Sequence, residues 1–236
     1  PLNKNDTDNL YYFFKKNKIK TIILFNSNGL KKTINNIDEI NNYIEQLDDN
    51  YIVKMYVSKK NNKLIFNNEL TAYNTLKLIY KSNLKKYTTI GDLVYKKFKY
   101  NGIILSNNKK EYYITFQLKC NKIIINDKAL IKLIHDISNS LIDLEKNKYA
   151  HTDIKIDNMI LCDNQYKLID WETLTKLSSP TRLYHSYFIS SPLTYYLNSK
   201  IYKRDILVFK IALLFEKKFK ILKSPYFKEI LHYIDL

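Results

Sequence analysis

The chain has 236 residues, 45% of them hydrophobic, which is enough for one globular domain of ordinary core size or one domain in two lobes. Its net charge of +16 comes almost wholly from lysine, because only Arg182 and Arg204 among the 39 basic residues are arginine. No apolar run reaches the roughly 18 residues of a membrane-spanning helix, and the opening PLNKNDTDN lacks the apolar region of a signal peptide, so neither feature is expected.

The N-terminal part of the chain predicts a β-rich structure that follows a short helix or arm at residues 1–20. A turn signal at Asn28-Gly29 separates two short β-type runs and predicts a hairpin. Apolar residues recur with helical spacing over residues 37–47, whereas the later run YIVKMYV alternates as a strand does. The strands expected in this part span residues 21–25, 30–34 and 51–57.

Helix and strand patterns continue through the middle of the chain. Glu69 opens an amphipathic segment with helical spacing. A second helix is expected at residues 128–148, where apolar residues share one face and Asn126 or Asp127 can cap the start. Further strands are expected at residues 90–95, 102–105 and 111–118, the last of which is aromatic and β-branched as buried strands are.

The stretch 149–172, YAHTDIKIDNMILCDNQYKLIDWE, is the most informative about chemistry. Asp153 and Asn158 precede a short apolar strand, and Asp170 follows a second strand after a polar turn. Because strands joined by a tight turn run antiparallel, the residue before the first and the residue after the second reach the same end. The three side chains would then surround one small volume, and their oxygen atoms suit hard divalent cations.

This pattern resembles the protein-kinase-like superfamily, whose catalytic loop reads H-R-D-L-K-x-x-N and precedes a metal-binding D-F-G. Here the corresponding residues are H-T-D-I-K-I-D-N, from His151 to Asn158, and D-W-E, from Asp170. The resemblance implies an α+β, two-lobed fold, with a small β-rich N-lobe at 1–118 and a truncated, mainly helical C-lobe at 119–236. The alternative interpretation is a loop with incidental polar residues beside a hairpin.

The resemblance also implies a function, which is phosphate transfer from ATP with the help of Mg²⁺. Asp153 would accept or orient the proton of the attacking hydroxyl group, and Lys155 would offset charge on the γ-phosphate. Asn158 and Asp170 would hold the magnesium ion against the phosphates. His151 would support the loop structurally.

The same resemblance assigns roles in the N-lobe. Lys54, aligned by Glu69, would position the nucleotide, as the strand lysine and helix glutamate of the family do. Gly29 would be the remnant of the family's glycine-rich loop over the phosphates, which is otherwise missing here. Residues 117–121 would form the hinge between the lobes. The alternative for Lys54 and Glu69 is two surface charges in a lysine-rich chain.

Three features of the C-terminal part bear on regulation. Thr152 replaces the arginine of the family's loop, so a phosphorylated activation segment would lack its usual clamp. Strong activation by phosphorylation within residues 173–191 is therefore not expected. Ser191-Pro192 resembles the end of the family's activation segment without its glutamate, and Asp205 resembles the aspartate that braces the catalytic loop.

Several functions remain open on the sequence alone. Lys155 resembles the serine/threonine protein kinases, whereas D-W-E resembles the aminoglycoside and choline kinases, so the phosphate acceptor is either a protein or a small molecule. A pseudokinase that serves as a scaffold is the second class. The positive charge suggests a third, binding to nucleic acid or an acidic partner, although scarce arginine argues against base-specific readout. The lysine excess also fits the coding bias of an AT-rich genome, such as a viral one.

The two cysteines, Cys120 and Cys162, lie far apart in the sequence and form no metal-type pair. They are not interpreted as a disulfide framework, and Cys162 is expected to be a packing residue. A reducing, cytoplasmic setting, such as a host cytoplasm or a virion, is therefore expected.

Overall fold

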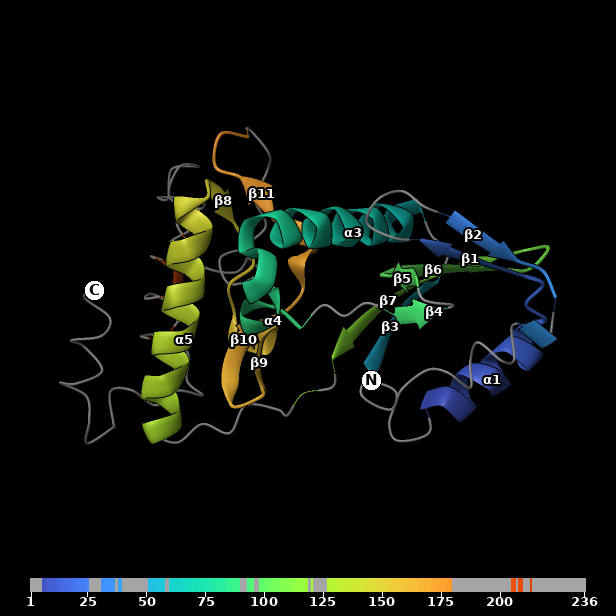
Figure 1. The fold of residues 1–236 in the computed structure, drawn as a ribbon, viewed down its shortest axis with the longest axis horizontal. Helices are drawn as coiled ribbons and strands as arrows, with labels where there is room; N and C mark the ends of the chain where they lie inside the picture. The colour runs from blue at the N-terminus through green and yellow to red at the C-terminus, as the bar shows by residue number, and fades with distance from the viewer. Residues whose placement is uncertain are drawn as a thin grey trace, which may run out of the picture. The chain divides into compact units, whose positions relative to one another are not determined.

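The computed structural model describes residues 6–25, 31–36, 38–39, 51–57, 60–89, 93–95, 98–118, 120, 127–179, 205–206, 208–209 and 213. These residues form a mixed α+β structure, with one five-stranded antiparallel sheet, three two-stranded sheets and several helices (Figure 1). The chain divides into two compact units, the first made of Pro1–Lys77 and Thr89–Lys119, the second of Leu78–Thr88 and Cys120–Leu236. Residues 78–88, expected in the N-terminal lobe, thus group with the second unit.

Several expected features fall outside the described residues. Among them are Gly29, the Ser191-Pro192 pair and most of the helix expected at 37–47, of which only residues 38–39 are described, as helical. Of the expected hinge, residues 119 and 121 are likewise outside.

The first unit is built around a sheet with the strand order β2-β1-β6-β7-β3, in which every neighbouring pair is antiparallel. Its elements are α1 (Asp6–Asn17), β1 (Thr21–Phe25), β2 (Lys31–Ile34), β3 (Tyr51–Val57), α3 (Lys60–Tyr80, to Lys77 in this unit), β4 (Leu93–Tyr95), β5 (Phe98–Tyr100), β6 (Gly102–Ser106) and β7 (Glu111–Leu118). The strands expected at 21–25, 51–57 and 111–118 are confirmed with those bounds.

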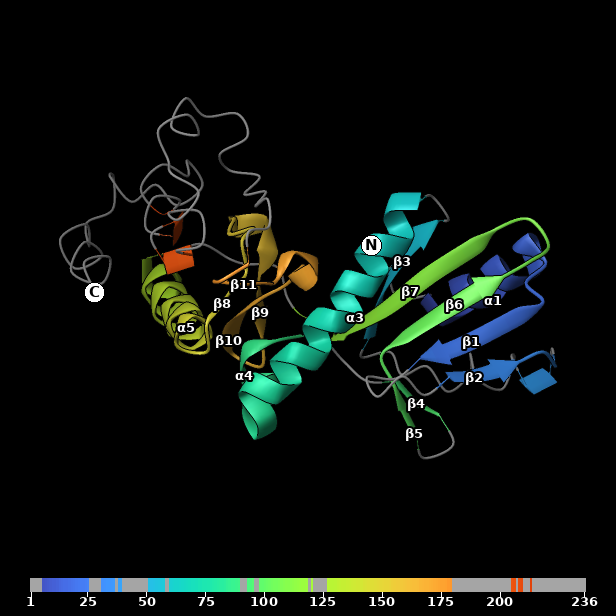
Figure 2. The same ribbon diagram turned by 90° about the horizontal axis from the view of Figure 1, so that it is seen from above.

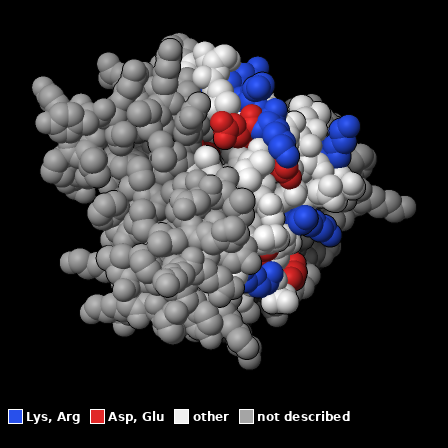
Figure 3. Space-filling model, turned by 90° about the vertical axis from the view of Figure 1, so that its left-hand side faces the viewer, with Lys and Arg blue, Asp and Glu red and all other residues white. Residues whose placement is uncertain are grey.

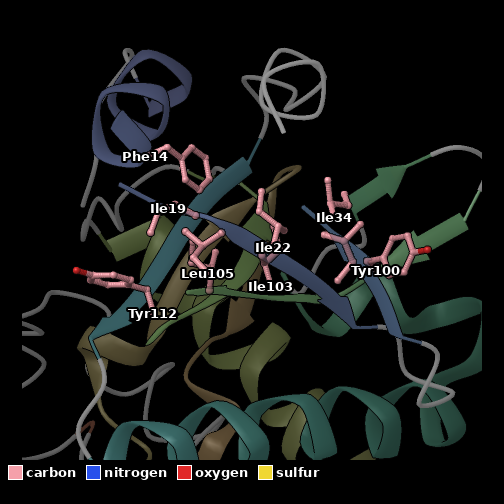
Figure 4. Packing of buried hydrophobic residues seen from close by; sticks show 10 residues of the cluster. Phe14, Ile19, Ile22, Ile34, Tyr100, Ile103, Leu105 and Tyr112 are labelled. Atoms are coloured by element: carbon pink, nitrogen blue, oxygen red, sulfur yellow. The ribbon is translucent and has the colours of Figure 1, made fainter. Parts of the chain in front are cut away.

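One face of this sheet carries the hydrophobic core of the unit and is covered by α1 (Figure 4). Alternate residues of each strand point to the same face, so Leu24 of β1 and its register partner Ile103 of β6 meet there. Burial of each such side chain contributes about 1.5–3 kcal/mol. The buried residues of this cluster are Phe14, Ile19, Ile22, Leu24, Ile34, Tyr100, Ile103, Leu105, Tyr112 and Ile114.

The opposite face packs against α3 (Figures 1 and 2). Phe66 of α3 lies against Tyr113 of β7, with ring centroids 5.3 Å apart. A Cβ atom at Gly102 would lie 2.9 Å from Phe66 Cζ, so a glycine is needed at this close approach. The helix begins at Lys60, so the prediction that it opens at Glu69 is wrong. Its first residues, KNNK, are polar and carry no periodic signal, although the apolar face of the helix already includes Phe66.

The second unit places a long helix beside a hairpin (Figure 1). Asp136 of the helix accepts a hydrogen bond from the Tyr166 amide at 3.0 Å, which ties the two together. Asp163 and Asn164 have φ of 52° and 57°, as a tight hairpin turn requires. The elements are α4 (Leu84–Tyr87), α5 (Asp127–Lys146), β8 (Tyr149–Ala150), β9 (Met159–Cys162), β10 (Gln165–Leu168) and β11 (Thr175–Lys176), with short 3-10 helices at Lys81–Asn83 (η1), Ile156–Asn158 (η2) and Trp171–Thr173 (η3).

Contacts of two tyrosines explain why residues 78–88 belong to the second unit. The rings of Tyr80 and Tyr87 pack with centroids 4.4 Å apart, and the Tyr87 hydroxyl donates to Asp143 of α5 at 2.8 Å. Thr88 then pairs in parallel with Leu168, at the end of β10. Burial of both rings and this bridge anchor the segment to α5 and the hairpin.

Cys120 and Cys162 form a disulfide bond, with their Cα atoms 4.8 Å apart. The interpretation that they do not pair is therefore wrong. The chain brings Cys120 next to Cys162, the last residue of β9, a proximity that a separation of 42 residues conceals. Among the described residues, no helix combines the length and apolarity that a membrane crossing needs.

Candidate active site

The β9–β10 hairpin determines where Asn158 and Asp170 lie. Its last register pair is Met159 with Leu168, and beyond it the Ile169 amide donates to the Asn158 carbonyl at 2.9 Å. Asn158 therefore faces Ile169, and Asp170 is the next residue along the chain. The hairpin thus brings both residues to one end, as the strand–turn–strand pattern predicts.

Asp153 is in direct contact with the other two polar residues of its loop. Its carboxylate oxygen Oδ2 accepts hydrogen bonds from Lys155 Nζ at 2.8 Å and from Asn158 Nδ2 at 2.9 Å. The Asn158 amide also donates to the Asp153 carbonyl at 2.9 Å. Asp153 is only 9% exposed, so these bonds hold a mostly buried carboxylate in one orientation.

The donor set at this end of the hairpin fits a magnesium ion. Both bonds from Asn158 to Asp153 use the amide nitrogen, so the amide oxygen is the atom that can act as a metal ligand. Within the described residues, no group of three or more histidine, cysteine, aspartate or glutamate side chains is arranged to hold a metal. Mg²⁺ needs no such cluster, because one or two carboxylates, water and substrate phosphates usually complete its coordination.

His151 is the hub of the loop, and all four of its polar atoms are used. Its amide donates to Asp205, and its carbonyl accepts from the Thr173 hydroxyl at 2.6 Å. Its ring atom Nδ1 accepts from the Asp153 amide at 3.3 Å, and Nε2 lies 2.9 Å from the Ile169 carbonyl. This pattern fits a neutral imidazole that donates from Nε2, and it supports the expected structural role.

Trp171 is a neighbour of the candidate site that the sequence analysis missed. The indole is fully buried, its ring centroid lies 4.6 Å from that of His151, and its Nε1 donates to the Leu168 carbonyl at 3.0 Å. Trp171, the residue directly after Asp170, thereby packs against the loop that contains His151. D-W-E shows an aromatic residue at this position, but nothing in the spacing shows what the ring contacts.

Asp205 braces the loop from a distant part of the chain, as its resemblance to the family's aspartate predicts. Its two carboxylate oxygens accept the amides of His151 and Thr152, the latter at 3.0 Å. Burial raises the pKa of its carboxyl from 3.8 to about 7, although the two amide bonds oppose the rise. Nearby Glu145 raises this pKa further through charge repulsion.

This raised pKa predicts a pH dependence of stability. The native carboxyl binds its proton more tightly than the unfolded one, so the free energy of unfolding should fall as pH rises from about 4 to about 7. Asp205→Asn should be less stable at low pH, because an amide can accept only one of the two N–H groups, but its profile should lack this fall. Urea unfolding at several pH values checks both, and parallel profiles would contradict the assignment.

In the first unit, Glu69 lies against β7 rather than on the surface. Its carboxylate is 3% exposed and accepts hydrogen bonds from the Thr115 hydroxyl at 2.9 Å and Gln117 Nε2 at 3.1 Å. Lys54 is the register partner of Thr115 and therefore belongs to the same face of the sheet, while its side chain lies outside what the structure describes. The interpretation of Glu69 as a surface charge is wrong, and its pairing with Lys54 stays a prediction.

The sequence-predicted residues thus fall into separate groups. Asp153, Lys155 and Asn158 are in contact in the second unit, with Asp170 one residue beyond the partner of Asn158. Glu69 lies in the first unit, with two β7 partners that no sequence pattern indicated. Comparison of the sequence with protein-family models and with curated proteins finds no match.

Proposed function

We propose that the chain is an ATP- and Mg²⁺-dependent phosphotransferase of the protein-kinase-like type, with the two-lobed fold of that superfamily and a protein serine or threonine as the acceptor. The observation that carries this proposal is the contact of Asp153 with both Lys155 and Asn158, in a loop that the hairpin joins to Asp170. A carboxylate, an ammonium group and an amide in this order supply a proton acceptor, a counter-charge and a metal ligand.

Each residue then has one task in the transfer. Asp153 accepts the proton of the acceptor hydroxyl group. At the same time the hydroxyl oxygen bonds to the γ-phosphorus, and the bond between the γ-phosphorus and the β–γ bridging oxygen breaks. Lys155, bonded to Asp153 at 2.8 Å, offsets the negative charge that gathers near the reacting oxygens. Asn158 and Asp170 would hold Mg²⁺, which supplies charge neutralisation at the phosphates.

The nucleotide-binding role of the first unit is part of the same proposal. Glu69 is held on the same sheet face as position 54. In the proposal, Glu69 orients Lys54 there so that the lysine contacts the phosphates. Gly29 would contribute backbone close to the phosphates. The hydrogen bonds from Thr115 and Gln117 compensate for the burial of the Glu69 carboxylate, because a buried carboxylate is costly unless it is hydrogen-bonded or paired.

Thermal unfolding with and without nucleotide tests the proposal. ATP with Mg²⁺ at about 100 times its Kd should stabilise the protein by roughly 2.7 kcal/mol, and ATP with EDTA should stabilise it less. Asp170→Asn should lose the Mg²⁺-dependent part. The matched control is Asp163→Asn on the exposed hairpin turn, which should keep it. Absence of any shift in the intact chain would contradict the proposal and favour a scaffold.

The acceptor is distinguished in a separate assay. Radiolabelled ATP incubated with a cell lysate should label protein bands, whereas labelling confined to small molecules would indicate an aminoglycoside- or choline-kinase-like enzyme. The charge of +16 leaves nucleic acid or an acidic protein as a further partner. On the described part of the surface in Figure 3, lysines lie next to acidic residues. The expectation of a reducing, cytoplasmic setting rested on unpaired cysteines, and the disulfide removes that ground, because such bonds persist in oxidising compartments.

A further inference from the structure

Two threonine hydroxyls join the loop of Asp153 to the segment that follows Asp170. The Thr152 hydroxyl donates to the Thr173 carbonyl at 2.9 Å, and the Thr173 hydroxyl donates to the His151 carbonyl at 2.6 Å. Thr152 is 1% exposed. We refer to these two bonds, from Thr152 to Thr173 and from Thr173 to His151, as the threonine clasp.

The clasp lies where the backbone hydrogen bonding between β8 and β11 ends. Strands β8 and β11 pair Tyr149 with Lys176 and Ala150 with Thr175, and the same register places Thr152 opposite Thr173. The Thr152 amide cannot extend this ladder, because it donates to Asp205 instead. The hydroxyl group of Thr152 therefore takes the place of its amide in binding the Thr173 carbonyl.

The backbone at Thr152 shows that this arrangement is imposed by its surroundings. Its φ is 67°, a left-handed conformation that β-branched residues rarely adopt. Such strain costs on the order of 1–3 kcal/mol and persists only where neighbouring contacts over-determine it. Here the bonds of Thr152 to Asp205 and Thr173 supply those contacts, so the clasp helps to hold the strained backbone of Thr152 in place.

The clasp lies close in sequence to Asp170, the carboxylate proposed to bind the metal. Asp170 also has a left-handed backbone, with φ 62° and ψ 59°. On one side, Ile169 is held by Asn158 and His151; on the other, Trp171 is buried and Thr173 is held by the clasp. Asp170 is therefore fixed from both directions by hydrogen bonds and packing of its neighbours in sequence.

We propose that Thr152 and Thr173 are positioning residues that hold Asp170 and the segment after it in their working arrangement. Each hydroxyl does so through a hydrogen bond to a backbone carbonyl of the other segment. This inference rests on the proposed function.

Hydroxyl removal at constant shape tests the clasp. Thr152→Val and Thr173→Val keep the branched side chain and remove one hydrogen bond each, so each should lower the rate of phosphate transfer from radiolabelled Mg·ATP to casein by about tenfold. Thr152→Ser and Thr173→Ser retain the hydroxyl and should restore most of this rate. The matched control is Thr71→Val, because the Thr71 hydroxyl donates to the Asn67 carbonyl on the exposed face of α3.

Amide hydrogen exchange gives a second readout that does not depend on activity. The amides of Leu174 and Leu177 are bonded to Trp171 and Lys148 and should exchange about tenfold faster in both valine variants. Wild-type exchange and wild-type rates in these variants would overturn the clasp. If the intact chain binds no Mg·ATP and transfers no phosphate, the proposed function fails, and the exchange rates alone decide on the clasp.

Discussion

Replacing Asp153 with asparagine is expected to lower the rate of phosphate transfer by about 10²–10⁴-fold, the contribution of a positioned proton acceptor. The amide keeps the size of the carboxylate and can still accept hydrogen bonds from Lys155 and Asn158, so the loop should stay folded. It cannot accept the proton of the attacking hydroxyl. The KM for ATP should therefore change little while the rate at saturation falls, as measured with radiolabelled ATP.

The control for this variant lies in the same loop. Asp157→Asn makes the same change of charge at an exposed residue four positions further on, and it should transfer phosphate at the normal rate. Equal losses in both variants would indicate a general charge effect rather than proton transfer. Full activity in Asp153→Asn would contradict the assignment of Asp153 as the proton acceptor.

Opening the disulfide is expected to produce the largest change in stability. Cys120 and Cys162 are separated by 42 residues, and closing a loop of this size lowers the entropy of the unfolded chain by an amount equivalent to roughly 4 kcal/mol. Cys120→Ser or Cys162→Ser should lower the free energy of unfolding by up to about this amount. Urea unfolding with and without dithiothreitol measures the effect.

The double variant Cys120→Ser/Cys162→Ser serves as the control for the reductant. Dithiothreitol should destabilise the intact protein and leave the double variant unchanged, since the described residues contain no other cysteine pair. An intact protein whose stability does not respond to the reductant would show that the bond does not contribute in solution. Mass spectrometry of the non-reduced protein would then establish whether the bond forms.

The strands were predictable because their pattern is local. Residues of β1 and β7 point alternately to a face that packs on α1 and a face that packs on α3, so both strands are short runs rich in apolar, aromatic and β-branched residues. The beginning of α3 was not predictable in the same way, because its first turns are polar and carry no periodic signal. Tertiary packing of Phe66, rather than local preference, extends the helix.

From spacing alone, the candidate site was predictable only where its residues are neighbours in sequence, whereas the contact of Asp205 with the loop was predicted from the family resemblance. Asp153, Asn158 and Asp170 lie on one loop and one hairpin, and antiparallel pairing is enough to bring their ends together. Contacts between distant segments left no such trace. The partners of Glu69 on β7, the Cys120–Cys162 bond and the Thr152–Thr173 clasp each depend on a register or a chain path that spacing does not encode.

Trp171 gives this protein an intrinsic optical probe at a useful place. It is the single tryptophan of the chain, among 21 tyrosines, so excitation at the red edge of protein absorbance selects one indole. That indole is fully buried against His151 and follows Asp170 directly. Its emission therefore monitors the surroundings of Asp170, the carboxylate proposed to bind the metal, in unmodified protein, without a dye or an added label.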